Sequence, residues 1–129
     1  MKILFFLLAC FACAAEAHKP SDSFLAVRVD NAAVHIQWDI ALRDLEFAIG
    51  LDGDGNGEVT WGELKAKRRE LEAYALSRLK ILSDEKSCAL AAAGLLVDEH
   101  SDGAYAVLRI DADCGGRPAR TAEIGDGEP

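Results

Sequence analysis

Positive charge, histidine and long apolar segments are all scarce in this chain. Lys and Arg number 14 against 22 Asp and Glu, so the formal net charge is −8, and there are only three His. A chain this acidic is a poor candidate for binding nucleic acid, which attracts basic surfaces. After residue 17, no apolar run approaches the roughly 20 residues that a membrane-spanning helix needs. The sequence therefore predicts no transmembrane segment beyond that point.

Recognisable catalytic motifs are missing as well. We find no Ser–His–acid spacing that could support nucleophilic catalysis and no glycine-rich phosphate-binding loop. The carboxylates of Asp39 and Asp44 lie beside Trp38 and Arg43, where ordinary strand and helix charges explain them. The sequence predicts that the protein is not an enzyme.

The first 17 residues have the pattern of a secretory signal peptide. Lys2 supplies the positive start, and residues 3–15 form an apolar run too short to span a bilayer. Ala15-Glu16-Ala17 matches an A-x-A cleavage site, so we expect cleavage between Ala17 and His18 and a periplasmic or secreted location. The alternatives are an uncleaved anchor and a lipoprotein signal ending at Cys10.

Residues 52–63, D-G-D-G-N-G-E-V-T-W-G-E, match a twelve-residue EF-hand calcium loop. Alternate residues of this tight loop point inward, so their oxygens can surround a hard cation. Position 6 is Gly57, where the chain needs a backbone angle that glycine adopts cheaply. The predicted calcium ligands are the side chains of Asp52, Asp54 and Asn56, the backbone carbonyl of Glu58, a water held by Thr60, and both carboxylate oxygens of Glu63. The alternative is a surface turn that binds nothing.

Apolar residues at helical spacing flank this loop. Before it, Leu42, Leu45 and Ile49 recur on one face. After it, a second helix is predicted from Trp61 to about Leu82, with a solvated basic face opposite its apolar stripe. That stripe consists of Leu64, Leu71, Ala75, Leu79 and Leu82.

The segments outside the helices favour two β-hairpins. Residues 24–29 and 34–41 alternate apolar and polar side chains around a turn at residues 30–33. Residues 88–97 fit a strand or a short helix by composition alone. They read as a strand because residues 98–103 form a turn and residues 104–111 are strand-like.

The two cysteines that follow the predicted signal peptide support the second hairpin. Cys88 and Cys114 each lie thirteen residues from Ser101, so a hairpin folded about that residue places them opposite each other. Facing positions on paired strands suit a disulfide, which an exported protein readily forms. The alternative is a pair of buried free thiols.

The fold class that follows is α+β: an antiparallel sheet of two β-hairpins, with an EF-hand helix–loop–helix inserted between them. Residues 18–114 form one domain, and residues 115–129, which have little apolar content, are predicted to be a disordered tail. A second calcium loop is missing, because a start at Asp98 or Asp111 puts Arg109 or Ala122 at position 12. A lone loop needs another scaffold, and the hairpins are the candidate.

Three stretches resemble the exported N-terminal region of bacterial HupE/UreJ-like membrane proteins: H-K-P-S-D-S-F-L at residues 18–25, residues 37–64, and D-E-H-S-D-G-A-Y-A-V-L-R at residues 98–109. The resemblance covers nearly all of residues 18–113 and implies a bacterial envelope location. That family is tied to nickel or cobalt transport, and its members continue into a multi-helix membrane part. Residues from Cys114 onward depart from the pattern, so the implied partner is a membrane protein or a membrane part missing from this chain.

Two metal-binding hypotheses follow. The first is an exported protein whose single calcium ion locks the fold. Locking is favoured over signalling because calcium sensors expose an apolar groove that is often rich in methionine, and the only methionine is Met1. The alternative is a nickel- or copper-binding accessory module, in which the amine and imidazole of His18 chelate the metal after cleavage.

Overall fold

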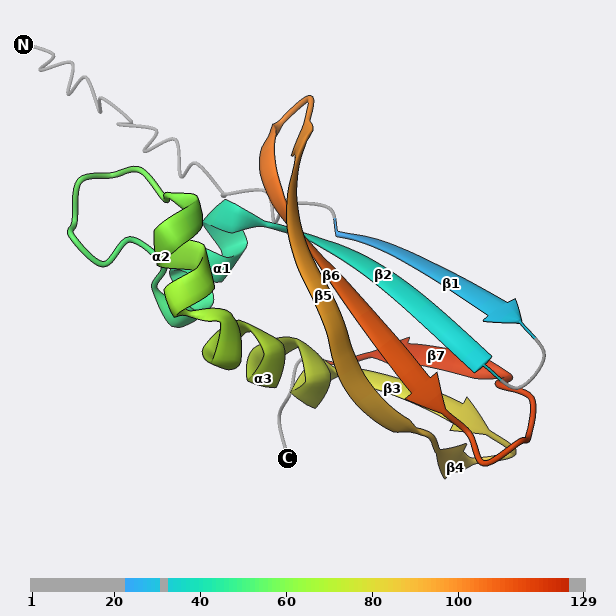
Figure 1. Cartoon of the computed structure of the whole chain (residues 1–129). Coiled ribbons are helices and arrows are strands. Elements are labelled where there is room, and N and C mark those ends of the chain that lie inside the picture. Colours follow the sequence, from blue (N-terminus) through green and yellow to red (C-terminus); the bar gives the residue numbers. More distant parts are fainter. Residues whose placement is uncertain (1–22, 31–32, 126–129) are drawn as a thin grey trace, which may run out of the picture.

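A computed structural model describes residues 23–30 and 33–125 of the chain. The predicted signal peptide, its cleavage site at Ala17 and His18, and the proposed His18 chelate lie outside these residues. The fold is mixed α+β, with short helices and antiparallel sheets (Figure 1). No helix in the described ranges is long and apolar enough to cross a membrane.

The larger sheet has four strands in the order β1-β2-β6-β5, all antiparallel. Both predicted hairpins are confirmed, and the pairing of β2 with β6 joins them into one sheet. The strands are β1 (Phe24–Asp30), β2 (Ala33–Ala41), β5 (Ala89–His100) and β6 (Gly103–Asp113).

Alternation along β2 and β6 explains why these segments form the centre of the sheet. Ile36 faces Ile110 and Trp38 faces Leu108 across the strand pair, and all four side chains are buried. Their neighbours in the chain point to the opposite face, as the period of two in a strand requires. Branched and aromatic side chains on this inner face therefore fix the register.

Three helices follow β2 and precede β3: α1 (Leu42–Ile49), α2 (Trp61–Ala66) and α3 (Arg68–Arg78). The prediction of one helix from Trp61 to about Leu82 is wrong. The helix breaks at Lys67, which nothing in the sequence explains, and α3 ends at Arg78. From Leu79 the burial alternates along β3 (Leu79–Ser83), with Leu79 and Ile81 inward, so the period has changed from helix to strand.

The smaller sheet has three strands in the order β4-β3-β7, where β4 is Lys86–Ser87 and β7 is Thr121–Ile124. The predicted disordered tail is therefore wrong at β7. All four β7 side chains are exposed, and the strand is held by antiparallel pairing of its backbone with β3. Backbone pairing does not require particular side chains, so the sequence did not indicate this strand.

The predicted disulfide is present between Cys88 and Cys114, whose Cα atoms lie 4.3 Å apart. Ala89 and Asp113 are the last facing pair of the β5–β6 hairpin, and the two cysteines are the next residues outside that pair. Both sulfur-bearing side chains are buried. The bridge thus ties the open end of the β5–β6 hairpin into the core.

One apolar core fills the space on the inner face of the four-stranded sheet. Helices α1 and α3 contact this sheet at one end, and the three-stranded sheet contributes Leu79 and Ile81 to the same cluster. Figure 1 shows the smaller sheet beneath the open end of the larger one. Among the described residues, no helix or strand layer covers the outer face.

A polar contact ties the tip of the β5–β6 hairpin to the start of α1. The Arg43 guanidinium donates to the backbone carbonyl and to the carboxylate of Asp102, each at 2.8 Å, and the Tyr105 hydroxyl donates to the same carboxylate at 2.8 Å. These hydrogen bonds, from Tyr105 first and then Arg43, lower the pKa of Asp102 below its usual 3.8. The folded state therefore favours the ionised carboxylate.

This contact predicts a specific pH dependence. Because the pKa of Asp102 is lower in the folded protein, its contribution to stability is fully present above the ordinary carboxyl pKa and is lost as the pH falls through the folded value. Asp102→Asn should reduce the free energy of unfolding at pH 7, and the difference from wild type should shrink below about pH 4. Urea titrations of both proteins at pH 7 and in strong acid measure this difference in stability. A difference that stays constant with pH contradicts a lowered pKa of Asp102 in the folded protein.

Candidate metal centre

The acidic loop joins α1 to α2 and extends from the helical end of the molecule, away from the sheets (Figure 1). Its two ends are fixed in the core. Leu51, immediately before Asp52, and Leu64, immediately after Glu63, are each 1% exposed. Val59, within the loop, also packs against the core cluster. The two ends of the loop are therefore tied to buried side chains, whereas residues 53–58 between them are exposed.

Backbone N–H groups of the loop converge on Asp52. Its Oδ1 accepts from the N–H of Gly55 at 3.0 Å, and its Oδ2 accepts from the N–H of Gly57 at 2.7 Å. Gly57 has φ of +85°, in the left-handed region that side-chain-bearing residues avoid. This conformation turns the chain around the Asp52 carboxylate, as the sequence predicts for position 6.

At the other end of the loop, Glu63 and Thr60 form a capping box at the start of α2. Thr60 Oγ1 accepts from the N–H of Glu63 at 3.1 Å, while Glu63 Oε1 accepts from the N–H of Thr60 at 3.0 Å. The second carboxylate oxygen of Glu63 accepts from the N–H of Gly53 at 2.6 Å. Glu63 thus connects the start of the loop to the second helix.

The structure brings together three of the predicted ligands. One carboxylate oxygen from each of Asp52, Asp54 and Glu63 lies within 4.8 Å of the others. Oxygens that each bind Ca²⁺ at about 2.3–2.6 Å can be up to about 5 Å apart, so this spacing fits a shared cation. The three carboxylates are half-buried or exposed, which leaves them accessible from solvent.

The other predicted ligands lie close by but are engaged locally. The Asn56 amide nitrogen donates to Asp54 Oδ2 at 3.2 Å, and its oxygen accepts from the N–H of Glu58 at 2.9 Å. A cation would need the amide oxygen turned toward it. Thr60 is occupied by the capping box, and the Glu58 side chain makes no hydrogen bond within the described part of the chain.

The carboxylates differ in how readily they ionise. The hydrogen bond from the Gly57 N–H lowers the pKa of Asp52, and the hydrogen bond from the Thr60 N–H lowers that of Glu63. At Asp54 the Asn56 N–H acts to lower the pKa, but the contact with Asp52, desolvation and the charge of Glu63 together raise it above its usual 3.8. The contact with Asp52 and desolvation contribute most to this rise in pKa, and the neighbouring negative charges add to it. A divalent cation would favour the ionised form.

Sequence reasoning missed one residue that shapes the site. The Glu46 carboxylate on α1 accepts hydrogen bonds from the backbone N–H groups of Leu51 and Asp52, the latter at 2.7 Å. It thereby fixes the backbone at Asp52, the first predicted ligand position. Nothing in the sequence singles out Glu46 from other helix charges, whereas the capping box is visible as the Thr60-x-x-Glu63 spacing.

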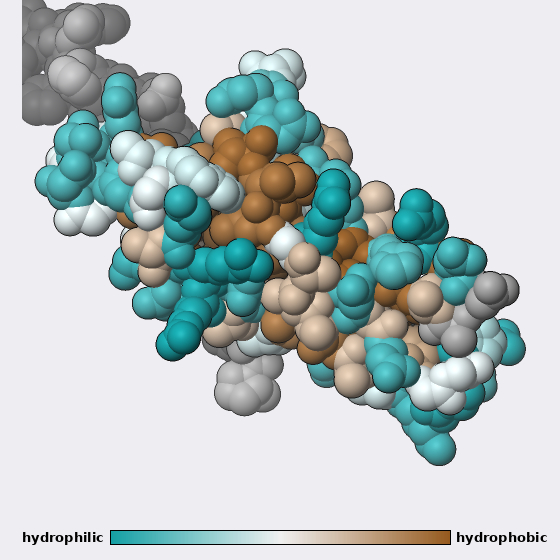
Figure 2. Space-filling view, viewed as in Figure 1, coloured by the Kyte–Doolittle hydropathy of each residue, from teal (hydrophilic) through white to brown (hydrophobic). Residues whose placement is uncertain are grey.

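The loop exit also forms one wall of an exposed apolar cleft of about 320 Å³. Figure 2 shows the apolar patch where the helices meet β5. The cleft lies between the start of α2 and the β5–β6 hairpin, and its lining includes Val59, Trp61, Leu64, Leu96 and Val97. Val59 and Thr60 of the loop thus contribute to the lining of this cleft.

Neither described histidine lies in this acidic cluster. His35 contacts Asp111 at 2.8 Å, and His100 contacts the buried carboxylate of Asp39 at 3.1 Å.

Comparisons with protein-family models, with curated proteins and with solved structures found no match to this chain.

Proposed function

We propose that this chain is an exported protein that binds one calcium ion in the loop of residues 52–63, and that the ion locks the fold. The convergence of the Asp52, Asp54 and Glu63 carboxylates within 4.8 Å carries the proposal. Acidic clusters on surfaces are common, but this one occurs at positions 1, 3 and 12 of an EF-hand pattern. A helix precedes the loop and another follows it.

Six residues would hold the ion. Asp52, Asp54 and Asn56 contribute side-chain oxygens, Glu58 its backbone carbonyl, Thr60 a bridging water and Glu63 two carboxylate oxygens. Calcium supplies a compact double positive charge that offsets the mutual repulsion of the three carboxylates. Glu63 also caps α2, so its ligation would couple the ion directly to the second helix.

Calcium binding should stabilise the whole domain because both ends of the loop are anchored. Leu51 and Leu64 are buried next to the first and last ligands, so ordering the loop also orders part of the core. A ligand at about 100 times its dissociation constant stabilises the state that binds it by about 2.7 kcal/mol. That is a large fraction of the roughly 5–15 kcal/mol typical of a folded domain.

An oxidising location outside the cytosol agrees with this proposal. Disulfides persist mainly in exported proteins, and Cys88–Cys114 closes the hairpin here. Calcium sites outside cells commonly have dissociation constants of about 10⁻⁴–10⁻³ M, so a lone loop of modest affinity can be filled there. The resemblance to the exported region of HupE/UreJ-like proteins points to the bacterial envelope, with a membrane protein as the expected partner.

Two matched variants test the ligand assignment. Glu63→Gln and Glu58→Gln each remove one negative charge from the loop, but only Glu63 is assigned as a side-chain ligand. Losing a charge-assisted contact to the ion should weaken calcium binding by Glu63→Gln at least about tenfold. Glu58→Gln should bind within about threefold of wild type, because exposed charges act weakly.

Competition with a calibrated calcium chelator measures all three affinities. Equal affinity of Glu63→Gln and wild type refutes the ligand assignment. Equal weakening in both variants shows that binding depends on the loop's net charge rather than on coordination by Glu63.

A further inference from the structure

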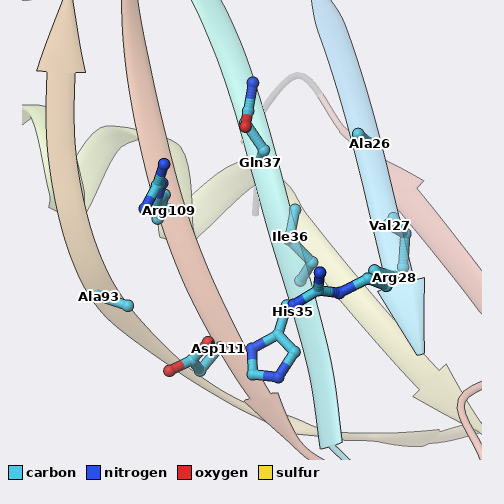
Figure 3. A pocket seen from close by; sticks show the side chains of 9 residues that line it. All are labelled: Ala26, Val27, Arg28, His35, Ile36, Gln37, Ala93, Arg109 and Asp111. Atoms are coloured by element: carbon cyan, nitrogen blue, oxygen red, sulfur yellow. Dashed lines mark hydrogen bonds and ion pairs between the residues drawn. The ribbon is translucent and has the colours of Figure 1, made fainter. Parts of the chain in front are cut away.

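The outer face of the four-stranded sheet carries an ordered set of polar side chains. Strand register places Arg28, His35 and Asp111 in one row across β1, β2 and β6. Gln37 and Arg109 face each other in the next row. Figure 3 shows these five side chains on the same side of the sheet. They come from three strands and are far apart in sequence, so only the fold assembles them.

Both arginines on this face lack a carboxylate partner within the described part of the chain. Four carboxylates lie on the same face, those of Asp30, Asp39, Asp111 and Asp113. Asp30 is exposed and forms no ion pair with Arg28, two residues away along β1. The other three are already engaged, and Asp113 accepts from the N–H of Gly115 at 2.8 Å. Asp111 contacts His35 Nδ1 at 2.8 Å, and Asp39 accepts from Gln37 at 3.0 Å and contacts His100 at 3.1 Å. The guanidinium groups therefore keep their donors free.

A groove of about 530 Å³ lies over these residues, within the usual size range of about 300–1,000 Å³ for small-molecule sites. Its lining includes Arg28, Arg109, His35 and Asp111, together with Ala26 and Ala93. The small side chains on β1 and β5 leave room above the sheet. Gly94 lies beneath Arg109, whose aliphatic carbons would be 3.7 Å from an added Cβ, so the glycine gives the arginine space to lie across β5.

The spacing of the arginines sets the size of a ligand. Arg28 lies on β1 and Arg109 on β6, with β2 between them, and Arg109 is two residues along β6 from Asp111, which is in the same row as Arg28. This offset places the Cα atoms of the two arginines about 12 Å apart at ordinary sheet spacings. The two guanidinium groups can therefore hold the two ends of one small molecule placed over β2.

We propose that this groove binds a small organic anion carrying two carboxylates, with Arg28 holding one carboxylate and Arg109 the other. A guanidinium presents parallel N–H donors that match a carboxylate in a two-point contact. His35, held through Nδ1 by Asp111 at 2.8 Å, also lines the groove. The site is separate from the acidic loop and does not depend on calcium.

Succinate, acetate and inorganic phosphate, added at matched ionic strength and without calcium, test this proposal on the ¹⁵N-labelled chain. The side-chain Nε–H signals of Arg28 and Arg109 should shift and saturate with succinate, and acetate should bind at least about fivefold more weakly. Arg28→Gln and Arg109→Gln should each weaken succinate binding about fivefold, as expected for exposed charged contacts, and the double variant should show no saturable shift. Arg69→Gln, which changes an exposed arginine on α3, is the matched control and should bind as wild type.

The proposal is overturned if shifts grow linearly without saturation, or if the double variant still binds succinate. Phosphate or acetate binding as tightly as succinate rejects a two-carboxylate ligand. All three arginines are exposed, and an unchanged amide spectrum elsewhere confirms that each variant is folded.

Discussion

Excess calcium should raise the melting temperature of the mature chain, residues 18–129, by roughly 10–20 °C over the chelated protein. The estimate takes about 2.7 kcal/mol for an ion at 100 times its dissociation constant and about 4–8 °C per kcal/mol for a domain of this size. The physical cause is the anchored loop. We expect calcium to offset the repulsion among Asp52, Asp54 and Glu63, which lie within 4.8 Å of one another. Leu51 and Leu64, buried at the two ends of the loop, should transmit the gain to the core.

Two controls separate this effect from general ionic stabilisation. Magnesium at the same concentration should raise the melting temperature much less, because Mg²⁺ demands shorter, near-octahedral ligation and loses its water reluctantly. Glu63→Gln should abolish the calcium shift, whereas Glu58→Gln should retain it. Equal melting curves in calcium and in chelator would mean that the loop is empty or uncoupled from the fold.

Removing the disulfide should lower the free energy of unfolding by about 3–4 kcal/mol. The bridge joins residues 26 positions apart, and the loop-closure estimate for such a span gives about 3.5 kcal/mol. The hairpin that it closes supplies β6 to the centre of the sheet and β5 to its edge. A double substitution, Cys88→Ala with Cys114→Ala, tests this in urea titrations with calcium held saturating.

Reductant provides the matched control for this prediction. It should destabilise the wild-type chain by a similar amount and leave the double variant unchanged. The calcium-induced rise in melting temperature should persist in the double variant if it remains folded, because the disulfide and the acidic loop lie at opposite ends of the core. A variant as stable as wild type contradicts the role given to the bridge.

The strands of the large sheet were predictable because their side chains alternate. Residues 34–41 place an apolar side chain at every second position, and the structure buries that set on the inner face. The facing of Cys88 and Cys114 followed from counting residues about the turn at Ser101. A one-residue shift in register would turn the apolar set outward, so burial itself constrains these assignments.

The end of α3 and the strand β7 were mispredicted for different physical reasons. Leu79 fits both a helical stripe and an alternating strand, and pairing of β3 with β4 and β7 decides between them. Residues 121–124 bury no side chain, so their strand depends on backbone hydrogen bonds that composition does not encode. Tertiary pairing thus overrides local preference in both segments.

The acidic loop was visible in the sequence because its predicted ligands are close together along the chain. The hydrogen bond that supports this loop was not visible in the sequence. Glu46 on α1 accepts from the backbone N–H of Asp52, and that contact depends on how the helix meets the loop. The groove with Arg28 and Arg109 was equally hidden. Its residues lie on different strands, and only the cross-strand register brings them together.

A calcium titration followed through backbone amide signals tests the central claim most directly, because it locates the ion as well as detecting it. The changes should be complete at one ion per chain and should be largest in residues 52–63. The Gly57 amide should respond strongly, since it donates to Asp52 Oδ2 at 2.7 Å. Loop signals that stay unmoved at about 10 mM calcium, above the usual range for extracellular sites, would contradict a calcium-binding loop.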